Sequence, residues 1–365
     1  MVPRQRPLEL WRMGATPVPV AQIGRLAQSF ESAGWDGLAV GEAHGLLPDP
    51  YAVLAAAAAA TTTLQLGTSV AVPLREPLLT AGAMATVHAL SGGRTRFVVG
   101  RGDGAMKVLQ RKPMGLEPFE RYLSQLQAHL RRAEVEDGGV VTSMSRLDDI
   151  DPSLALPKPP VDVAATGPRM IEVASRWADG IDFAVGADLE RLGRCVELAH
   201  AACEAAGRPP ASIGLGCYVQ VAVAADDEPG PREAVRGLIV THSRFSRFEG
   251  KVLADATADD GRLRNAVEVM EDVLRSTRGG VTPTAGGAPG ELDFYPREAI
   301  DDAFLDRFGI IGSPEYCTER LWQIGELGIE RIYVGTRGVG VDLEEANTLR
   351  IGREVIPRLR QRLAQ

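Results

Sequence analysis

Short strand-like runs alternate with helix-like segments along the whole chain of 365 residues. The runs are rich in β-branched and other apolar residues, whereas the segments between them repeat apolar residues every three or four positions. In the segment 18–33, for example, Ile23, Ala27 and Phe30 share one helical face. Eight strands are predicted, at residues 8–14, 37–42, 64–72, 95–102, 161–166, 180–186, 213–224 and 330–336. Helices are predicted at 18–33, 48–61, 117–133, 168–178, 188–206, 231–255, 261–277 and 314–327, with a last one ending at about 363.

This alternation predicts an α/β fold of the (β/α)8 barrel type, in which helices surround a ring of parallel strands. The length fits, because such barrels run to about 250 residues and longer where their loops carry insertions. We expect a single domain over residues 1–365, with the longest insertion at 225–311, after the seventh strand. The loops that follow barrel strands build the active site, so this insertion is expected on the active-site face. A smaller irregular region is expected at 136–160.

Composition narrows the classes of function. The chain is 45% hydrophobic and carries a net charge of −8 without a run of basic residues, which argues against a nucleic-acid partner. The first residues lack the apolar core of a signal peptide, and the longest apolar run, 55–60, is too short to cross a membrane. We therefore expect a cytoplasmic protein with no membrane partner. The four cysteines and five histidines are scattered, so neither disulfides nor a metal site is expected.

Residues that could carry chemistry follow the second and fourth predicted strands. Glu42 and His44 come directly after the second strand. His44 could transfer a proton near neutral pH, although a buried histidine that caps a loop is the alternative. Asp103 lies within the glycine-rich turn 100–104, whose spacing fits neither a dinucleotide fingerprint nor a P-loop. An ordinary turn is the alternative there.

The best candidate for a phosphate site follows the fifth strand. Thr166, Gly167, Pro168 and Arg169 lead into a predicted helix, and the first backbone amides of a helix bind anions well. Gly167 allows close approach, and Pro168 suits the first helical position because that position needs no N–H donor. Gly186, after the sixth strand, could add another amide.

Taken together, these residues resemble the bacterial-luciferase-like family of flavin-dependent oxidoreductases. Within it they are most similar to the branch that uses coenzyme F420, a deazaflavin, typified by methylenetetrahydromethanopterin reductase. The resemblance rests on residues 33–44, 64–105, 161–181 and 308–334. The order of these four blocks is specific, although each block alone is not.

The resemblance implies roles for the matched residues. His44 would exchange a proton beside the ring, and Asp103 would be a second catalytic residue. The peptide between Ser69 and Val70 would be cis and would lie behind the ring. The cofactor would be bound by residues at or just after the ends of the second to sixth strands, namely Glu42, Ser69, Val70, Val72, Arg101, Gly102, Thr166, Gly167, Pro168, Arg169 and Gly186.

The chain also departs from the sugar-phosphate dehydrogenases of this branch. Ala184 and Ala187 align with a threonine and a lysine that grip the substrate phosphate in those enzymes, and residues 46–48 replace a tryptophan. A phosphosugar substrate is therefore not expected.

The implied activity is hydride transfer between coenzyme F420 and an activated C=C, C=N or carbonyl group of a small molecule. A homodimer that pairs near the alanine-rich segment 50–61 is also implied. The first alternative is an FMN-dependent monooxygenase of the same family, supplied with reduced flavin by a partner reductase. The others are a barrel that binds flavin without catalysis and a lyase that needs no cofactor.

Overall fold

The computed structural model describes residues 7–14, 19–43, 47–102, 105–224, 230–232, 235, 302–336 and 341–364. Within them, parallel strands lie in the order β3-β2-β1-β11-β9-β8-β7-β4. These strands are β1 (Glu9–Gly14), β2 (Gly37–Val40), β3 (Gln65–Thr68), β4 (Phe97–Val99), β7 (Val161–Ala165), β8 (Gly180–Phe183), β9 (Gly214–Val223) and β11 (Arg331–Gly335).

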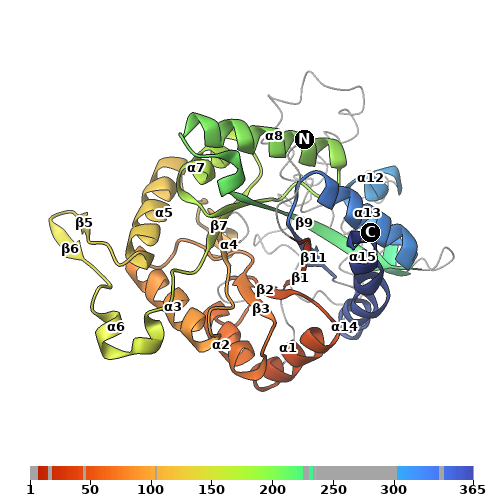
Figure 1. Ribbon diagram of the computed structural model, residues 1–365, viewed down its shortest axis with the longest axis horizontal. Coiled ribbons are helices and arrows are strands. Elements are labelled where there is room, and N and C mark those ends of the chain that lie inside the picture. The colour runs from red at the N-terminus through yellow and green to blue at the C-terminus, as the bar shows by residue number, and fades with distance from the viewer. Residues whose placement is uncertain are drawn as a thin grey trace.

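The two edge strands of this order meet, so the sheet is nearly closed into a barrel. Leu66 in β3 bridges to Thr95, just before β4, and Ala71 bridges to Val99. Figure 1 shows the helices arranged around the strands. The predicted barrel fold is therefore confirmed.

The helices begin where the sequence supplies caps. Asp49, Asp188 and Ser313 each accept hydrogen bonds from backbone amides of the turn that follows, which satisfies donors that have no partner within a helix. The helices around the barrel are α1 (Ile23–Ser32), α2 (Pro50–Ala60), α3 (Pro77–Leu90), α5 (Leu116–Leu130), α7 (Pro168–Trp177), α8 (Leu189–Ala205), α13 (Pro314–Glu326), α14 (Val341–Arg350) and α15 (Ile356–Leu363), with a short α4 (Ala105–Val108) after β4. None of the described helices is long and apolar enough to span a bilayer.

Three regions differ from the sequence-based prediction. α3 was not predicted, because its sequence is apolar almost throughout and shows no polar face from which a helical period could be read. The second, third, fourth and sixth strands end earlier than predicted, at Val40, Thr68, Val99 and Phe183. The region 136–160 is not wholly irregular, since β5 (Val135–Asp137) and β6 (Val140–Thr142) form an antiparallel hairpin and α6 (Leu147–Ile150) follows. Gly138 and Gly139, both at positive φ, make the two-residue turn of the hairpin.

Most of the segment 225–311 lies outside the described residues, including all of the predicted helix 261–277 and all but the first few residues of the predicted helix 231–255. Its end contains α12 (Asp302–Phe308) and leads into β10 (Gly309–Gly312), which pairs in parallel with β9. The ten residues of β9 therefore pair with β8 and β11 in their first part and with β10 in their last part.

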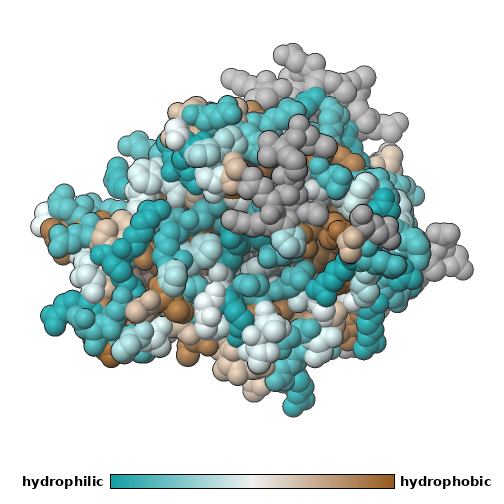
Figure 2. Space-filling view, viewed as in Figure 1, coloured by the Kyte–Doolittle hydropathy of each residue, from teal (hydrophilic) through white to brown (hydrophobic). Residues whose placement is uncertain are grey.

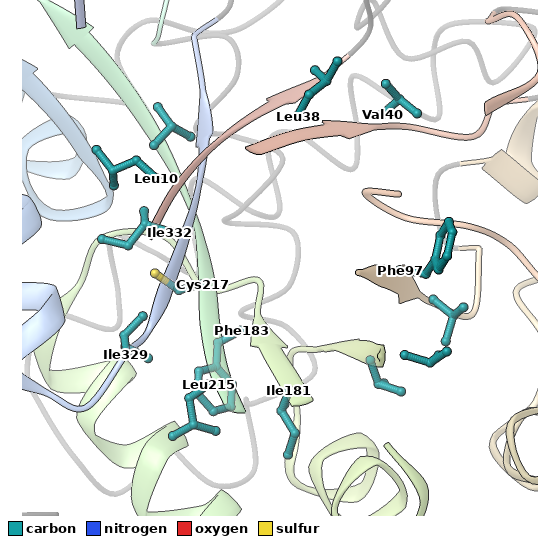
Figure 3. Close-up of a cluster of buried hydrophobic side chains, with 14 of the residues drawn as sticks. Leu10, Leu38, Val40, Phe97, Ile181, Phe183, Leu215, Cys217, Ile329 and Ile332 are labelled. Atoms are coloured by element: carbon teal, nitrogen blue, oxygen red, sulfur yellow. The ribbon is translucent and has the colours of Figure 1, made fainter. Parts of the chain in front are cut away.

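Apolar side chains that face outward from the strands form the main core between the sheet and the helices (Figure 3). Leu38, Phe97 and Ile332 are examples, each at most 1% exposed. Burial of such side chains contributes about 1.5–3 kcal/mol each and fixes which face of every strand points into the barrel. On the outer surface, hydrophilic side chains cover most of the face seen in Figure 2.

Candidate active site

Four charged side chains lie within the N-terminal end of the barrel. Arg96 Nη1 donates to both carboxylate oxygens of Asp162, at 2.7 and 2.9 Å. Arg331 Nη2 donates to Asp162 at 2.9 Å and to Asp182 at 3.5 Å. Burial and the nearby negative charge of Asp162 raise the pKa of Asp182 to about 7. Gly216 makes room for this layer, since a Cβ atom there would lie 2.0 Å from Asp182 Oδ1.

An aromatic layer covers the charged one. Tyr218 and Tyr333 stack with ring centroids 4.9 Å apart, and the Trp11 ring lies 5.6 Å from that of Tyr333. All three side chains are at most 4% exposed. The Trp11 ring packs against Gly37 and Gly67, where a Cβ atom would lie 2.3 Å and 3.1 Å from the ring. The two layers close the N-terminal part of the barrel, as packed side chains do in barrels of this kind.

Partly exposed side chains lie at the C-terminal end of the barrel. Met13, Val70, Ala164 and Ala184 pack on the aromatic layer, yet they are only partly buried. We call the surface that these residues form at the ends of their strands the barrel mouth. Gly100 adds no side chain to it, and a Cβ atom there would lie 3.0 Å from Val70 Cγ2. Gly100, Ala164 and Ala184 are small and can accept a flat ring over the aromatic layer, so the mouth fits the cofactor class that the resemblance implies.

The segment after β3 forms one wall of the mouth. The peptide between Ser69 and Val70 is cis, as the resemblance implied. Glu42 is buried, and its Oε2 accepts a hydrogen bond of 2.7 Å from the amide of Val72. The backbone amide of Glu42 in turn donates to the carbonyl of Val70 at 3.3 Å. Glu42 therefore ties this wall to the end of β2, while direct contact between Glu42 and a cofactor stays a prediction.

The residues after β4 are fixed by contacts within the protein. Arg101 Nε donates to the carbonyl of Met114 at 2.6 Å, and the amide of Met114 donates back to the carbonyl of Arg101. Gly102 adopts a φ of +88°, and a Cβ atom there would lie 2.8 Å from Met106 Cγ. Glycine is therefore required at this position. The buried Val72 lies next to Gly102.

The predicted phosphate loop lies beside the mouth. Gly167 is the N-cap of α7, Pro168 is its first residue, and nothing lies within 4 Å of a Cβ atom placed on Gly167. Thr166 is partly buried, whereas Arg169 is exposed. Gly186, at a φ of +76°, follows the neighbouring strand β8, which pairs with β7. Accessible amides at a helix N-terminus beside a glycine turn can bind a phosphate group.

Two of the predicted residues, His44 and Asp103, lie outside the described part of the chain. The structure brings the other predicted residues to the C-terminal ends of β2, β3, β4, β7 and β8. Trp11, Tyr218 and Tyr333 were not predicted as parts of the site. Side chains at every second position of a strand point to the same face of the sheet. This alternation within strands 8–14, 213–224 and 330–336 could have shown that the three aromatic rings face inward. In the described ranges, no three His, Cys, Asp or Glu side chains gather as a potential metal site.

Comparison with known proteins identifies the family. The sequence profile of the luciferase-like monooxygenases matches residues 7–331, most of the chain. The chain belongs to this family. The resemblance seen in the sequence is thereby confirmed, and with it the expectation of an oxidoreductase.

Individual relatives of this luciferase-like chain include both reductases and monooxygenases. It is 24% identical over 357 residues to the 5,10-methylenetetrahydromethanopterin reductase of Methanolobus tindarius, which covers 93% of this chain and 96% of that protein. Its fold is similar to that of the coenzyme F420-dependent tetrahydromethanopterin reductase of Methanopyrus kandleri, with a TM-score of 0.71, 20% identity and coverage of 97% and 99% of the two chains. It is also similar to a monooxygenase from Streptomyces bottropensis, with a TM-score of 0.63, 19% identity and coverage of 95% and 99%.

Proposed function

We propose that this luciferase-like protein is a coenzyme F420-dependent oxidoreductase. It transfers a hydride between the deazaflavin and an activated C=C, C=N or carbonyl group of a small molecule that is not a phosphosugar. The observation that carries the proposal is the barrel mouth, in which small, partly exposed side chains lie over an aromatic layer and beside the accessible N-terminus of α7. The similarity to reductases over nearly the full chain supports the deazaflavin as cofactor.

The residues of the mouth would hold the cofactor as follows. Val70 and Ala164 would contact the flat ring, while the amides around Gly167 and Gly186 would bind the phosphate. When bound, the reduced deazaflavin supplies the hydride, so the protein contributes orientation, proton transfer and exclusion of water. His44 is the proposed proton donor or acceptor, and Asp103 would position a polar group or relay the proton.

The proposal that the substrate lacks a sugar phosphate rests on the β8 end of the mouth. Ala184 faces inward and is partly exposed, and Ala187 is buried. Neither methyl group can donate a hydrogen bond or supply a positive charge to a phosphate. An apolar substrate surface packs against such side chains at lower cost than an anionic group.

The second candidate is an FMN-dependent monooxygenase of the same family, which the similarity to a solved monooxygenase favours. Oxygen chemistry separates the two functions. One oxygen molecule is consumed per reduced FMN with or without an enzyme, so the assay follows the rate of consumption in air. A monooxygenase should change this rate from that of reduced FMN alone, whereas we expect no change. A barrel that binds flavin without catalysis would also leave oxygen consumption unchanged. Unlike the proposed enzyme, it would transfer no hydride from reduced F420.

The position of the ring site is tested by filling the mouth. Ala184→Leu adds a branched side chain over the aromatic layer, whereas Ala201→Leu adds the same atoms on the exposed side of α8. We expect Ala184→Leu to weaken binding of oxidised F420 at least tenfold, measured by fluorescence quenching, and Ala201→Leu to leave it unchanged. Equal binding by both variants would mean that the ring lies elsewhere.

A homodimer is proposed as the assembly, with α2 near the interface. α2 has exposed alanines, Ala52 and Ala59, whose small side chains allow close packing of a second copy. Sedimentation equilibrium should give twice the mass of one chain. A single-chain mass at micromolar concentration would contradict this proposal.

A further inference from the structure

Arg75 joins the two ends of the loop that follows β2. This loop, residues 41–49, runs from the end of β2 to the N-cap of α2. One guanidinium nitrogen, Arg75 Nη2, donates to Asp49 Oδ2 at the end of the loop and lies 3.8 Å from Glu42 Oε1 near its start. The guanidinium group also packs on the Tyr51 ring, with Cζ 4.9 Å from the ring centroid. Since Arg75 follows β3, it ties the loop after β2 to the neighbouring strand connection.

Backbone amides already hold both carboxylates that Arg75 contacts. The Glu42 side chain is 2% exposed, and its other oxygen accepts a hydrogen bond from the amide of Val72. Asp49 Oδ1 accepts from two backbone amides in the first turn of α2, at 3.0 and 3.1 Å. A guanidinium group between two fixed carboxylates sets the position of one end of the loop relative to the other. It also offsets the cost of burying the Glu42 carboxylate.

The loop between these ends contains His44, the proposed proton donor or acceptor. Residues 44–46 lie outside the described part of the chain, but the residues that flank them are joined. The amide of Leu47 donates to the carbonyl of Ala43 at 2.9 Å. Leu47 also packs beside Gly41, since a Cβ atom on Gly41 would lie 3.7 Å from Leu47 Cδ1. The described residues of the loop are therefore held together both at its ends and around its middle.

We infer that Arg75 is a positioning residue for the proposed reaction. By pairing with Glu42 and Asp49 it holds the loop after β2 in one arrangement, so the proton transfer assigned to His44 depends on it. The inference rests on the proposed function, because that function gives His44 its role. A displacement of about 1 Å in a reacting group can lower the rate about 100-fold, so a group that fixes the loop has a large effect on turnover. Without Arg75, Glu42 keeps its bond to the Val72 amide, so cofactor affinity should change little.

The test combines Arg75→Gln with His44→Ala and follows the oxidation of reduced F420 by cyclohexenone, a probe with an activated C=C bond. We expect kcat to fall about 10- to 100-fold in Arg75→Gln, with the Kd of oxidised F420 within about threefold of the wild type. The double variant should be no slower than His44→Ala alone, because Arg75 acts through His44. A purely structural role would instead lower kcat further.

Two other variants complete the design. Asp49→Asn removes the charge that binds Arg75, while asparagine still caps α2, so it replaces Arg75→Gln if that variant does not fold. The control, Arg176→Gln, removes an ion pair of 2.8 Å between Arg176 and Glu120, which joins the C-terminal end of α7 to α5. We expect kcat to fall in Asp49→Asn and to stay unchanged in the control.

The outcomes separate this inference from the proposed function. Unchanged kcat in Arg75→Gln, or a double variant slower than His44→Ala, overturns the inference and leaves the proposed function standing. If the wild type does not bind F420, the proposed function fails. In that case, or if the wild type does not turn over the probe, hydrogen–deuterium exchange of the amides in 43–49 decides. We expect exchange about tenfold faster in Arg75→Gln than in the wild type and in Arg176→Gln, and equal exchange in all three would overturn the inference.

Discussion

Replacement of Asp162 by asparagine tests whether the buried ion pairs inside the barrel stabilise the fold. Asp162 is fully buried and accepts three hydrogen bonds from Arg96 and Arg331, each at 2.9 Å or less. Asparagine keeps the shape of the side chain but leaves the two guanidinium groups without that negative charge. Removing one partner from a buried ion pair costs about 3–5 kcal/mol. With an unfolding entropy of about 2.1 cal/mol/K per residue, the melting temperature of this chain should fall by roughly 4–7 °C.

The matched control is Asp182→Asn, measured at pH 6 by differential scanning calorimetry. The pKa of Asp182 is raised to about 7, so its carboxyl group is mostly neutral at pH 6 and asparagine is a close replacement. We expect this variant to melt within about 2 °C of the wild type, in line with the small effect of most neutral replacements. An equal fall of the melting temperature in both variants, or no fall in Asp162→Asn, would refute the view that Asp162 is ionised and Asp182 is mostly neutral at pH 6.

Three further predictions concern the pH dependence of stability, two glycines and His44. Because the pKa of Asp182 is raised from 3.8 to about 7, the folded protein holds a proton that the unfolded chain releases, so wild-type stability should fall as pH rises through this range. Asp182→Asn should lose this pH dependence in urea titrations. Gly216→Ala would force a Cβ atom to 2.0 Å from Asp182 Oδ1 and should prevent soluble expression, whereas Gly82→Ala in α3, where the Cβ position is open, should stabilise the protein by about 0.5–1 kcal/mol. His44→Ala should lower turnover about 10²–10⁴-fold with little change in cofactor affinity, and unchanged turnover would exclude His44 from the mechanism.

Much of the fold could be predicted from the sequence because most barrel strands are short apolar runs and several are followed by a helix with a readable period. α3 could not, since its nearly uniform apolar sequence hides the helical repeat. The glycine after the fifth strand and the proline that follows it identified the start of α7 because both residue types have a fixed use at a helix N-terminus.

The layers inside the barrel could not be predicted in the same way. Asp162 and Asp182 each appear in the sequence as one charge within an apolar run, and Arg331 follows Glu330 at the start of another, much later along the chain. The pairing of β7, β8, β9 and β11 brings them together, and the register between β9 and β11 places Tyr218 opposite Tyr333. The alternation of side chains along a strand shows which residues face inward, but the partner that each residue meets depends on the register between strands.

The central claim is that the barrel mouth binds a deazaflavin. Its most direct test is equilibrium binding of oxidised coenzyme F420 and of FMN to the wild-type protein, each followed by fluorescence quenching under the same conditions. We expect F420 to bind at least tenfold more tightly than FMN. Tight binding of FMN without binding of F420 would contradict the claim and assign the protein to flavin chemistry instead.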